Sequence, residues 1–261
     1  MTENSEVTNV IPATSLMSQK PPAPRATFQE QVLEELGKDI CTGRIRPGQL
    51  LPPEGELCER FGFSRIVIRE AIKSLAAKGL IEVTRRFGTL VLDTNRWNLF
   101  DTDIIEWRAQ SGSIDPVMAR DLMEIRRIIE PTAVRLAALR ASEDDKRNLR
   151  AAYMTMARAV AGKADYIKAD LEFHNIILSA CGNQFLRQMQ EAMAALLRVN
   201  FEVITKKPGG PAHSLPLHEA VCEAIEKGDA DAAERAALKL IDGAENDMRE
   251  LAPVNLPTSS R

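Results

Sequence analysis

The sequence has few cysteines and no paired cysteine motif. Cys41, Cys58, Cys181 and Cys222 lie far apart, and none belongs to a C-x-x-C pair. This spacing indicates neither a disulfide framework nor a cysteine-rich zinc site. We therefore expect free thiols in the reducing cytoplasm and assign these residues no chemical role.

Long hydrophobic runs are also missing. No stretch approaches the roughly 18 consecutive apolar residues of a membrane-spanning helix, so we expect no membrane partner. The first residues lack the basic start and the apolar run of a signal peptide. Residues 1–26 and 252–261 are polar and rich in Pro, Ser and Thr, which predicts a disordered tail at each end.

Aromatic residues are scarce at 5%, and the net charge of −3 excludes a protein that is basic throughout. A function on nucleic acid would need positive charge that is concentrated locally. Ala, Leu, Ile, Met, Glu and Arg dominate the second half, and this composition favours helices.

The N-terminal part predicts a helix, a tight turn and a longer helix. Residues 28–46 have the pattern of one helix, and a short helix over 53–61 is broken by Gly62. Ser64 then caps a helix that extends to about Lys78. The apolar face of this last helix, at helical spacing, consists of Ile68, Ala71, Ile72 and Leu75.

Positive charge is concentrated on this longer helix and on a predicted hairpin that follows it, "LIEVTRRFGTLVLD" at residues 80–93. Residues 60–89 contain seven cations and two acidic residues, and seven minus two gives a local charge of +5. Charged stripes are usually solvated helix faces. A helix-turn-helix, a basic stripe and a basic hairpin together predict a winged helix-turn-helix that binds double-stranded DNA. The stripe and the wing tip comprise Arg65, Arg69, Lys73, Arg85, Arg86 and Gly88.

This region resembles the DNA-binding domain of the GntR family of bacterial transcriptional regulators. The resemblance rests on "PGQLLPPEGEL", "SRIVIREAIKSLAAKGLI" and a glycine at the wing. Some members have an arginine where this chain has Gly55, so any contact from that position is missing. The DNA contacts that the resemblance implies are Ser64, Arg65 and Arg69, with the wing contributing around Arg86 and Gly88.

The remainder of the chain predicts helices and little else. Asp115 and Pro116 suit a helix start, Pro131 should kink or split that helix, and Ser142 with Asp145 resembles a capping box. Short connections predict an antiparallel bundle of six or seven helices, and hence a mainly α fold. Further helices are expected over 142–161, 164–180, 184–204, 213–227 and 230–250. The predicted domains are the winged helix-turn-helix over 27–92, a connector over 93–114 and the bundle over 115–251.

Asp170 and His174 lie four residues apart and therefore on one side of a helix. They could pair with each other or share a metal ion. The bundle resembles the FCD effector domain of the FadR-like subgroup, in "EIRRIIEPTAVRLAALRA", "ADLEFHNIILSACGNQFL" and "LHEAVCEAIEKGDADAAERAALKLI". That resemblance implies a divalent metal held by Asp170, His174 and His218. The subgroup's fourth ligand falls on Leu240, which cannot bind a metal.

The ligand types suit Zn²⁺ first, and Ni²⁺ or Mn²⁺ are compatible with them. The resemblance also places Arg126 in an effector pocket, where a guanidinium and a metal would suit a carboxylate. A salt bridge with Glu130 is the alternative for Arg126. Arg198 and Asn200 are further effector-binding candidates.

The connector "NRWNLFDTDIIEWRAQSG" resembles that of a D-galactonate-responsive branch of the family, which also lacks the fourth histidine. The resemblance implies a sugar-acid effector such as galactonate. We therefore expect a regulator rather than an enzyme, most simply a repressor. As a homodimer it would bind a pseudo-palindromic operator on the nucleoid.

Two alternatives remain open from the sequence. Metal occupancy itself could be the signal, or a metal-dependent hydrolase could be fused to a DNA-binding module. No general base or nucleophile is evident beside the expected ligands, which argues against the hydrolase.

Overall fold

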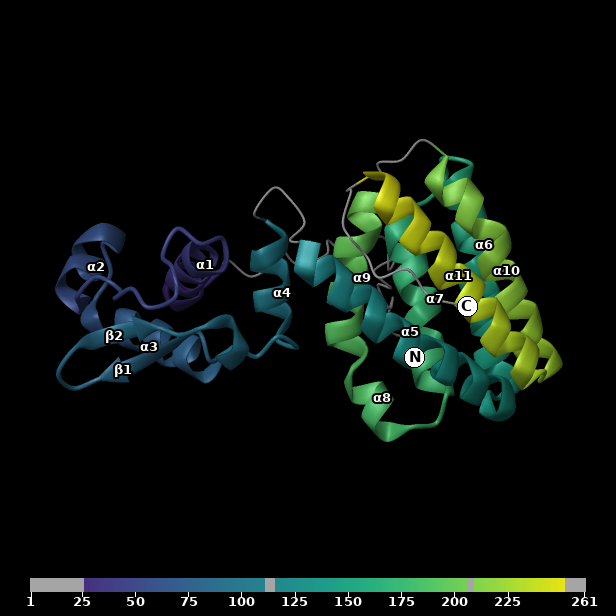
Figure 1. Cartoon of the computed structure of the whole chain (residues 1–261), viewed down its shortest axis with the longest axis horizontal. Helices are drawn as coiled ribbons and strands as arrows, with labels where there is room; N and C mark the ends of the chain where they lie inside the picture. The colour runs from purple at the N-terminus through teal and green to yellow at the C-terminus, as the bar shows by residue number, and fades with distance from the viewer. Residues whose placement is uncertain (1–25, 111–115, 206–208, 252–261) are drawn as a thin grey trace, which may run out of the picture.

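The computed structural model describes residues 26–110, 116–205 and 209–251, and gives only the backbone for residues 116, 200, 202–204 and 251. Figure 1 shows a small head and a larger helical bundle, with one short helix between them. The predicted mainly α fold, with a winged helix-turn-helix and a helical bundle, is confirmed. The predicted tails lie outside the described residues, apart from residue 26. None of the described helices is both long and apolar enough to cross a membrane.

The head contains three helices and a hairpin. Thr27 and Glu30 form a capping box at the start of the first helix, which ends at Cys41 and not at residue 46 as predicted. The earlier end follows from Gly43, whose positive φ of 79° is incompatible with a continuing helix. The elements are α1 (Phe28–Cys41), α2 (Glu54–Phe61), α3 (Arg65–Ala77), β1 (Ile81–Thr84) and β2 (Gly88–Val91).

The turn between α2 and α3 depends on Gly62, which has a left-handed conformation with φ 70°. The apolar side of α3 packs into the core of the head, with Ile68 and Leu75 fully buried. β1 and β2 pair antiparallel from Ile81↔Val91 to Thr84↔Gly88 and form the wing. This packing fixes which side of α3 faces the solvent.

The connector forms a 3-10 turn, η1 (Thr94–Arg96), and a helix, α4 (Thr102–Ala109), that packs on both domains. On the head side, Trp107 lies against α1 so closely that a Cβ on Gly37 would come within 2.3 Å of the Trp107 ring. On the bundle side, Ile105 packs with Ala192 and Val199. The connector is therefore a packed element and not a loose linker.

The bundle comprises α5 (Pro116–Arg140), α6 (Glu143–Val160), α7 (Tyr166–Ala180), α8 (Gln184–Gln188), α9 (Gln190–Ile204), α10 (Gly210–Lys227) and α11 (Ala230–Leu251). The predicted capping box of Ser142 and Asp145 is present. Pro131 lies inside α5 without splitting it. The single helix predicted over 184–204 is wrong, because the chain breaks at Met189 into α8 and α9.

The bundle core is apolar except at one place. α7 packs against α5, α6 and α9, and its Phe173 and Ile177 are buried. Among the described residues of the bundle, six buried polar side chains interrupt this core around one place, where α11 joins α5, α7 and α10. They are Arg126, Glu130, Asp170, His174, His218 and Asp247.

Candidate DNA-binding face and candidate metal centre

The outer side of α3 presents its cations to the solvent. Arg69 has a side chain that is 60% exposed, and it pairs with Glu54 of α2 at 2.9 Å. Lys73 is 72% exposed and pairs with Glu70 at 2.7 Å. Ser64 and Arg65 are also exposed. Such exposed ion pairs contribute roughly 0–1 kcal/mol, so a phosphate can replace the carboxylates at little cost.

The wing tip carries Arg85, Arg86 and Gly88, all exposed. The Thr84 hydroxyl donates to the Gly88 carbonyl at 2.9 Å and accepts from the Phe87 N–H at 3.2 Å. This turn holds the basic tip in the same small head as α3 (Figure 1).

Two of the seven cations counted from the sequence belong elsewhere. Arg60 pairs with Asp39 of α1 at 2.9 Å. Lys78 pairs with Asp101 of the connector at 2.8 Å, and its side chain is only 16% exposed. The local charge of +5 therefore overstates the charge of the face, which rests on the three cations of α3 and the two arginines of the wing.

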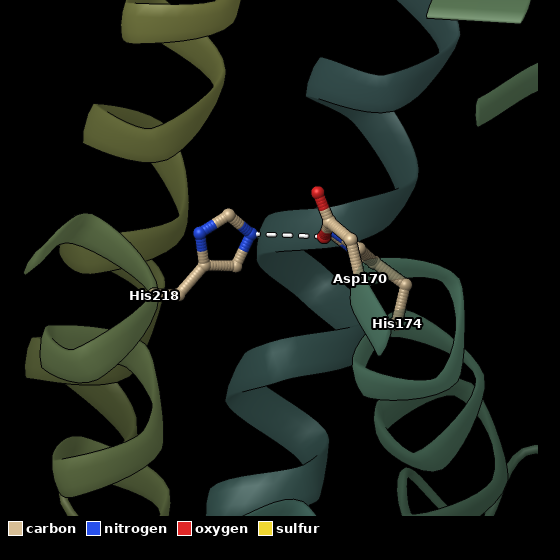
Figure 2. Close-up of side chains that lie close together, drawn as sticks. All are labelled: Asp170, His174 and His218. Carbon is tan, nitrogen blue, oxygen red and sulfur yellow. Dashed lines mark ion pairs between the residues drawn. The ribbon is translucent and has the colours of Figure 1, made fainter. Parts of the chain in front are cut away.

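The second candidate site lies in the bundle, where α7 and α10 bring three side chains together (Figure 2). α7 places Asp170 and His174 one turn apart, and α10 supplies His218. The Asp170 Oδ1 lies 3.1 Å from His218 Nε2 and 3.4 Å from His174 Nε2. One ligand atom from each residue lies within 4.8 Å of the others, and all three residues are buried.

Hydrogen bonds alone leave this cluster unsatisfied. Among the described residues, the buried side-chain N and O atoms without a hydrogen-bond partner are Arg126 Nη1, Asp170 Oδ1, His174 Nε2 and His218 Nε2. The 3.1 Å approach of Asp170 to His218 thus lacks hydrogen-bond geometry. Each unpartnered buried group costs about 1–3 kcal/mol, and here all of them belong to a single site.

The imidazole of His218 is oriented for binding a cation. Its Nδ1 lies 3.0 Å from the Ser214 carbonyl and donates a hydrogen bond to it, which turns Nε2 toward Asp170. These donors fit a divalent metal, because a carboxylate and two imidazoles are common ligands of Zn²⁺.

The charge of the centre is set by its neighbours. Burial alone raises the pKa of Asp170, but His218 and His174 outweigh it and hold that pKa well below its usual range. Burial likewise raises the pKa of Glu130, whereas Arg126 and His174 bring it below the ordinary value. Both carboxylates are therefore ionised at neutral pH.

Arg126 forms the salt bridge that was the alternative to an effector-binding role, and its position beside the cavity is compatible with that role as well. Its Nε donates to Glu130 at 2.7 Å, so the salt bridge is present. Its Nη1 remains without a partner, and Arg126 lines the same cavity as Asp170 and His218. Glu130 Oε2 also lies 3.7 Å from His174 Nδ1, which connects the guanidinium to the candidate metal centre.

The cavity beside this centre is small, at about 30 Å³. A buried water needs at least about 10–15 Å³, so the space fits an ion with one or two waters and not a whole sugar acid. Leu240, at the position that the resemblance assigns to the fourth ligand, is buried and lines the cavity. His213 also lines it, but is exposed and outside the cluster of ligand atoms.

Of the remaining effector-binding candidates, Arg198 is not brought to this centre. Arg198 is exposed and lies outside the lining of the cavity. The side chain of Asn200 falls outside the described residues.

Sequence reasoning missed one polar wall of the cavity. The Tyr166 hydroxyl lies 2.6 Å from Ser214 Oγ, and both residues line the cavity. A signal was available, because Tyr166, Asp170 and His174 recur every four residues and Ser214 precedes His218 by the same step.

Comparisons with known proteins identify two families along the chain. The family model "Bacterial regulatory proteins, gntR family" matches residues 28–91, and the model "FCD domain" matches residues 121–243. The chain is 35% identical to the galactonate operon transcriptional repressor of Escherichia coli K12, over 85% of this chain and 97% of that protein. It is 32% identical to the HTH-type transcriptional regulator YieP of the same strain, over 80% of this chain and 90% of that protein.

Among solved structures, the Listeria monocytogenes regulator Lar is similar in fold. The TM-score is 0.62 at 20% identity, and the match covers 87% of this chain and 99% of that one. This likeness concerns the fold alone.

Proposed function

Because the chain belongs to the GntR family of bacterial transcriptional regulators and carries an FCD domain, we propose that it is a metabolite-controlled repressor. In this proposal its operator binding responds to a small carboxylate held beside a divalent metal in the bundle. Proteins of this family are DNA-binding regulators and not enzymes, which removes the hydrolase alternative.

In the proposed complex, α3 enters the major groove and the wing follows the backbone. The exposed residues Ser64, Arg65 and Arg69 lie at the start of α3, where a recognition helix reaches base edges and phosphates. Lys73, Arg85 and Arg86 contribute phosphate contacts, and Gly88 lets the wing approach closely. A homodimer would place two such heads on a pseudo-palindromic operator, on the nucleoid in the cytoplasm.

The observation that carries the sensor half of the proposal is the set of four buried atoms at one cavity that have no hydrogen-bond partner. Asp170, His174 and His218 would hold the metal, with Zn²⁺ as the first choice and Ni²⁺ or Mn²⁺ compatible. A bound ion would supply positive charge for one oxygen of an anion. Arg126 Nη1 would donate to another oxygen, and Leu240 leaves coordination positions open.

A sugar acid such as galactonate is the proposed effector. The name of the Escherichia coli galactonate operon repressor, which is 35% identical, supports this choice. The Tyr166 and Ser214 hydroxyls offer partners for a polyol chain. Since the cavity is only about 30 Å³, its walls must move apart to admit such a ligand, and Arg198 of α9 would reach the ligand only after that movement. Asn200 is proposed as a further effector contact.

Calorimetry tests the sensor half directly. Zn²⁺-loaded and chelator-treated protein are titrated with galactonate, with gluconate and with neutral galactose. We expect galactonate to bind the Zn²⁺-loaded protein and to bind at least tenfold more weakly after chelation. Galactose should not bind.

Arg126→Lys is a second test. It keeps a positive charge beside Glu130 but loses the planar guanidinium with its several N–H donors, so it should weaken galactonate binding without releasing metal. The proposal is contradicted if the affinity for galactonate is changed neither by chelation nor by Arg126→Lys.

The small cavity favours a second candidate function, in which metal occupancy is itself the signal. In that case Zn²⁺ alone would change operator affinity, and no sugar acid would change it further. Operator titrations with Zn²⁺ and without any sugar acid separate the two functions.

A further inference from the structure

Ile66, in the first turn of α3, is 75% exposed, which is the highest value for a large hydrophobic side chain among the described residues. Arg65, Arg69 and Lys73 surround it on the same helix, and all three are exposed. An apolar side chain at the centre of a cationic face has no structural role that is visible in the head.

The direction of Ile66 excludes a loosely packed core position. Side chains rotate by roughly 100° per residue in a helix, so the buried Ile68, Ala71, Ile72 and Leu75 define one side of α3. On the same basis Ile66 points about 180° away from their mean direction, directly out of the head. A β-branched residue there also gains nothing in helix propensity.

The chemistry of the DNA groove identifies a partner for this side chain. In a helix-turn-helix complex, the N-terminal residues of the second helix contact base edges in the major groove. The apolar group that bases present there is the 5-methyl group of thymine. We propose that Ile66 is a specificity-determining residue that recognises a thymine in each operator half-site through this methyl group. The inference rests on the proposed DNA binding by α3 and deepens it.

Isolated exposed hydrophobic residues are common on protein surfaces and need no function. The bundle provides a matched example, because Ile128 on α5 is 71% exposed. Ile128→Ala therefore serves as the control for Ile66→Ala. Both substitutions shorten an exposed isoleucine on a helix, and neither removes a buried contact.

The experiment begins with full-length protein and a random-sequence duplex library, from which a high-affinity operator is selected. Each thymine of that operator is then replaced in turn by deoxyuridine, which lacks only the 5-methyl group. Operator affinities are measured by fluorescence anisotropy for wild type, Ile66→Ala, Ile128→Ala and Arg69→Ala.

For wild type we expect one thymine per half-site at which deoxyuridine weakens binding about fourfold, the factor that burial of one methyl group supplies. Ile66→Ala should weaken binding to the thymine operator by at least as much and be insensitive to deoxyuridine at that position. Ile128→Ala should behave as wild type. Melting temperatures of all four proteins should agree to within about 5 °C, because each substitution is at an exposed side chain and costs little stability.

The inference is overturned if Ile66→Ala retains the wild-type sensitivity to deoxyuridine at every position, or if wild type has no sensitive thymine. Arg69→Ala separates this failure from failure of the proposed function. If Arg69→Ala binds the operator as tightly as wild type, or the library yields no operator, then DNA binding by α3 is wrong as well. If Arg69→Ala loses binding while Ile66→Ala shows no methyl dependence, the thymine contact alone is wrong.

Discussion

The head and the bundle each contain an arginine–carboxylate pair of similar length in opposite surroundings. In the head, Arg69 and Glu54 lie 2.9 Å apart with side chains that are 60% and 35% exposed. In the bundle, Arg126 and Glu130 lie 2.7 Å apart and are 1% and 8% exposed. The exposed pair can exchange its carboxylate for a DNA phosphate at little cost, whereas breaking the buried pair would leave an uncompensated charge away from water. The comparison teaches that burial, and not distance, distinguishes the pair on the proposed DNA-binding face from the pair in the proposed sensor.

The largest expected effect follows from removing one arginine of each pair. Arg126→Met leaves the Glu130 charge buried without its main partner, and should lower the free energy of unfolding by about 3–5 kcal/mol. Arg69→Met should lower it by less than about 1 kcal/mol, because its partner is solvated. Urea unfolding followed by circular dichroism measures both, and equal losses would refute the comparison.

Removing a ligand from the candidate metal centre should have the next largest effect. Mutating a residue that only hydrogen-bonds to a metal ligand typically lowers metal affinity by up to about 100-fold. His218→Ala removes a ligand itself, so we expect it to lower Zn²⁺ affinity by more than that. The rise in melting temperature on adding Zn²⁺ should disappear with it. Competition with a chromophoric chelator gives the affinity.

His213→Ala is the control for that measurement, because His213 lines the cavity but lies outside the ligand cluster. It should keep wild-type affinity for Zn²⁺. If both variants lose the metal equally, His213 is a ligand and the assigned centre is wrong.

Removing a cation from the exposed face of α3 should weaken operator binding without changing metal binding in the bundle. Arg69→Ala should weaken operator binding by about 100-fold in a dimer, since each lost contact costs about 1–3 kcal/mol. Its Zn²⁺ content should stay the same. Arg147→Ala removes an exposed arginine of α6, on the bundle, and should leave operator affinity unchanged. Anisotropy titrations at fixed salt would disprove the assignment of α3 if the two variants behaved alike.

The smallest effect in the series is a gain. Leu240→His places an imidazole where Leu240 already lines the cavity, and should tighten Zn²⁺ binding by about tenfold, with the fourth ligand closing the coordination shell. Galactonate affinity should fall, because an open position is lost. Unchanged affinities for both ligands would show that residue 240 does not face the ion.

Local patterns predicted much of the fold because the features that specify it are close in sequence. The spacing of Ile68, Ile72 and Leu75 fixed the buried side of α3, and the Ser142–Asp145 box marked the start of α6. The break at Met189 has no glycine or proline beside it, so no local pattern predicts it. Counting Lys78 in the local positive charge was misleading for a different reason, because its partner Asp101 is supplied by tertiary packing.

The candidate metal centre was only partly visible from the residues themselves. The register of Asp170 and His174 follows from helical spacing, but His218 joins them across the bundle and was identified through family resemblance. The role of Glu130 between Arg126 and His174 needed the packed structure, because it depends on distances between α5 and α7. The size of the cavity is likewise a property of the packed side chains.

The claim that a small anion in the bundle controls the head is tested most directly by measuring both affinities in one protein. With Zn²⁺-loaded full-length protein, operator affinity is determined with and without saturating galactonate, and galactonate affinity with and without operator. The account predicts that each ligand weakens the other by the same factor, at least fivefold, because coupling between two binding sites is reciprocal. An operator affinity that stays constant at every galactonate concentration would contradict it.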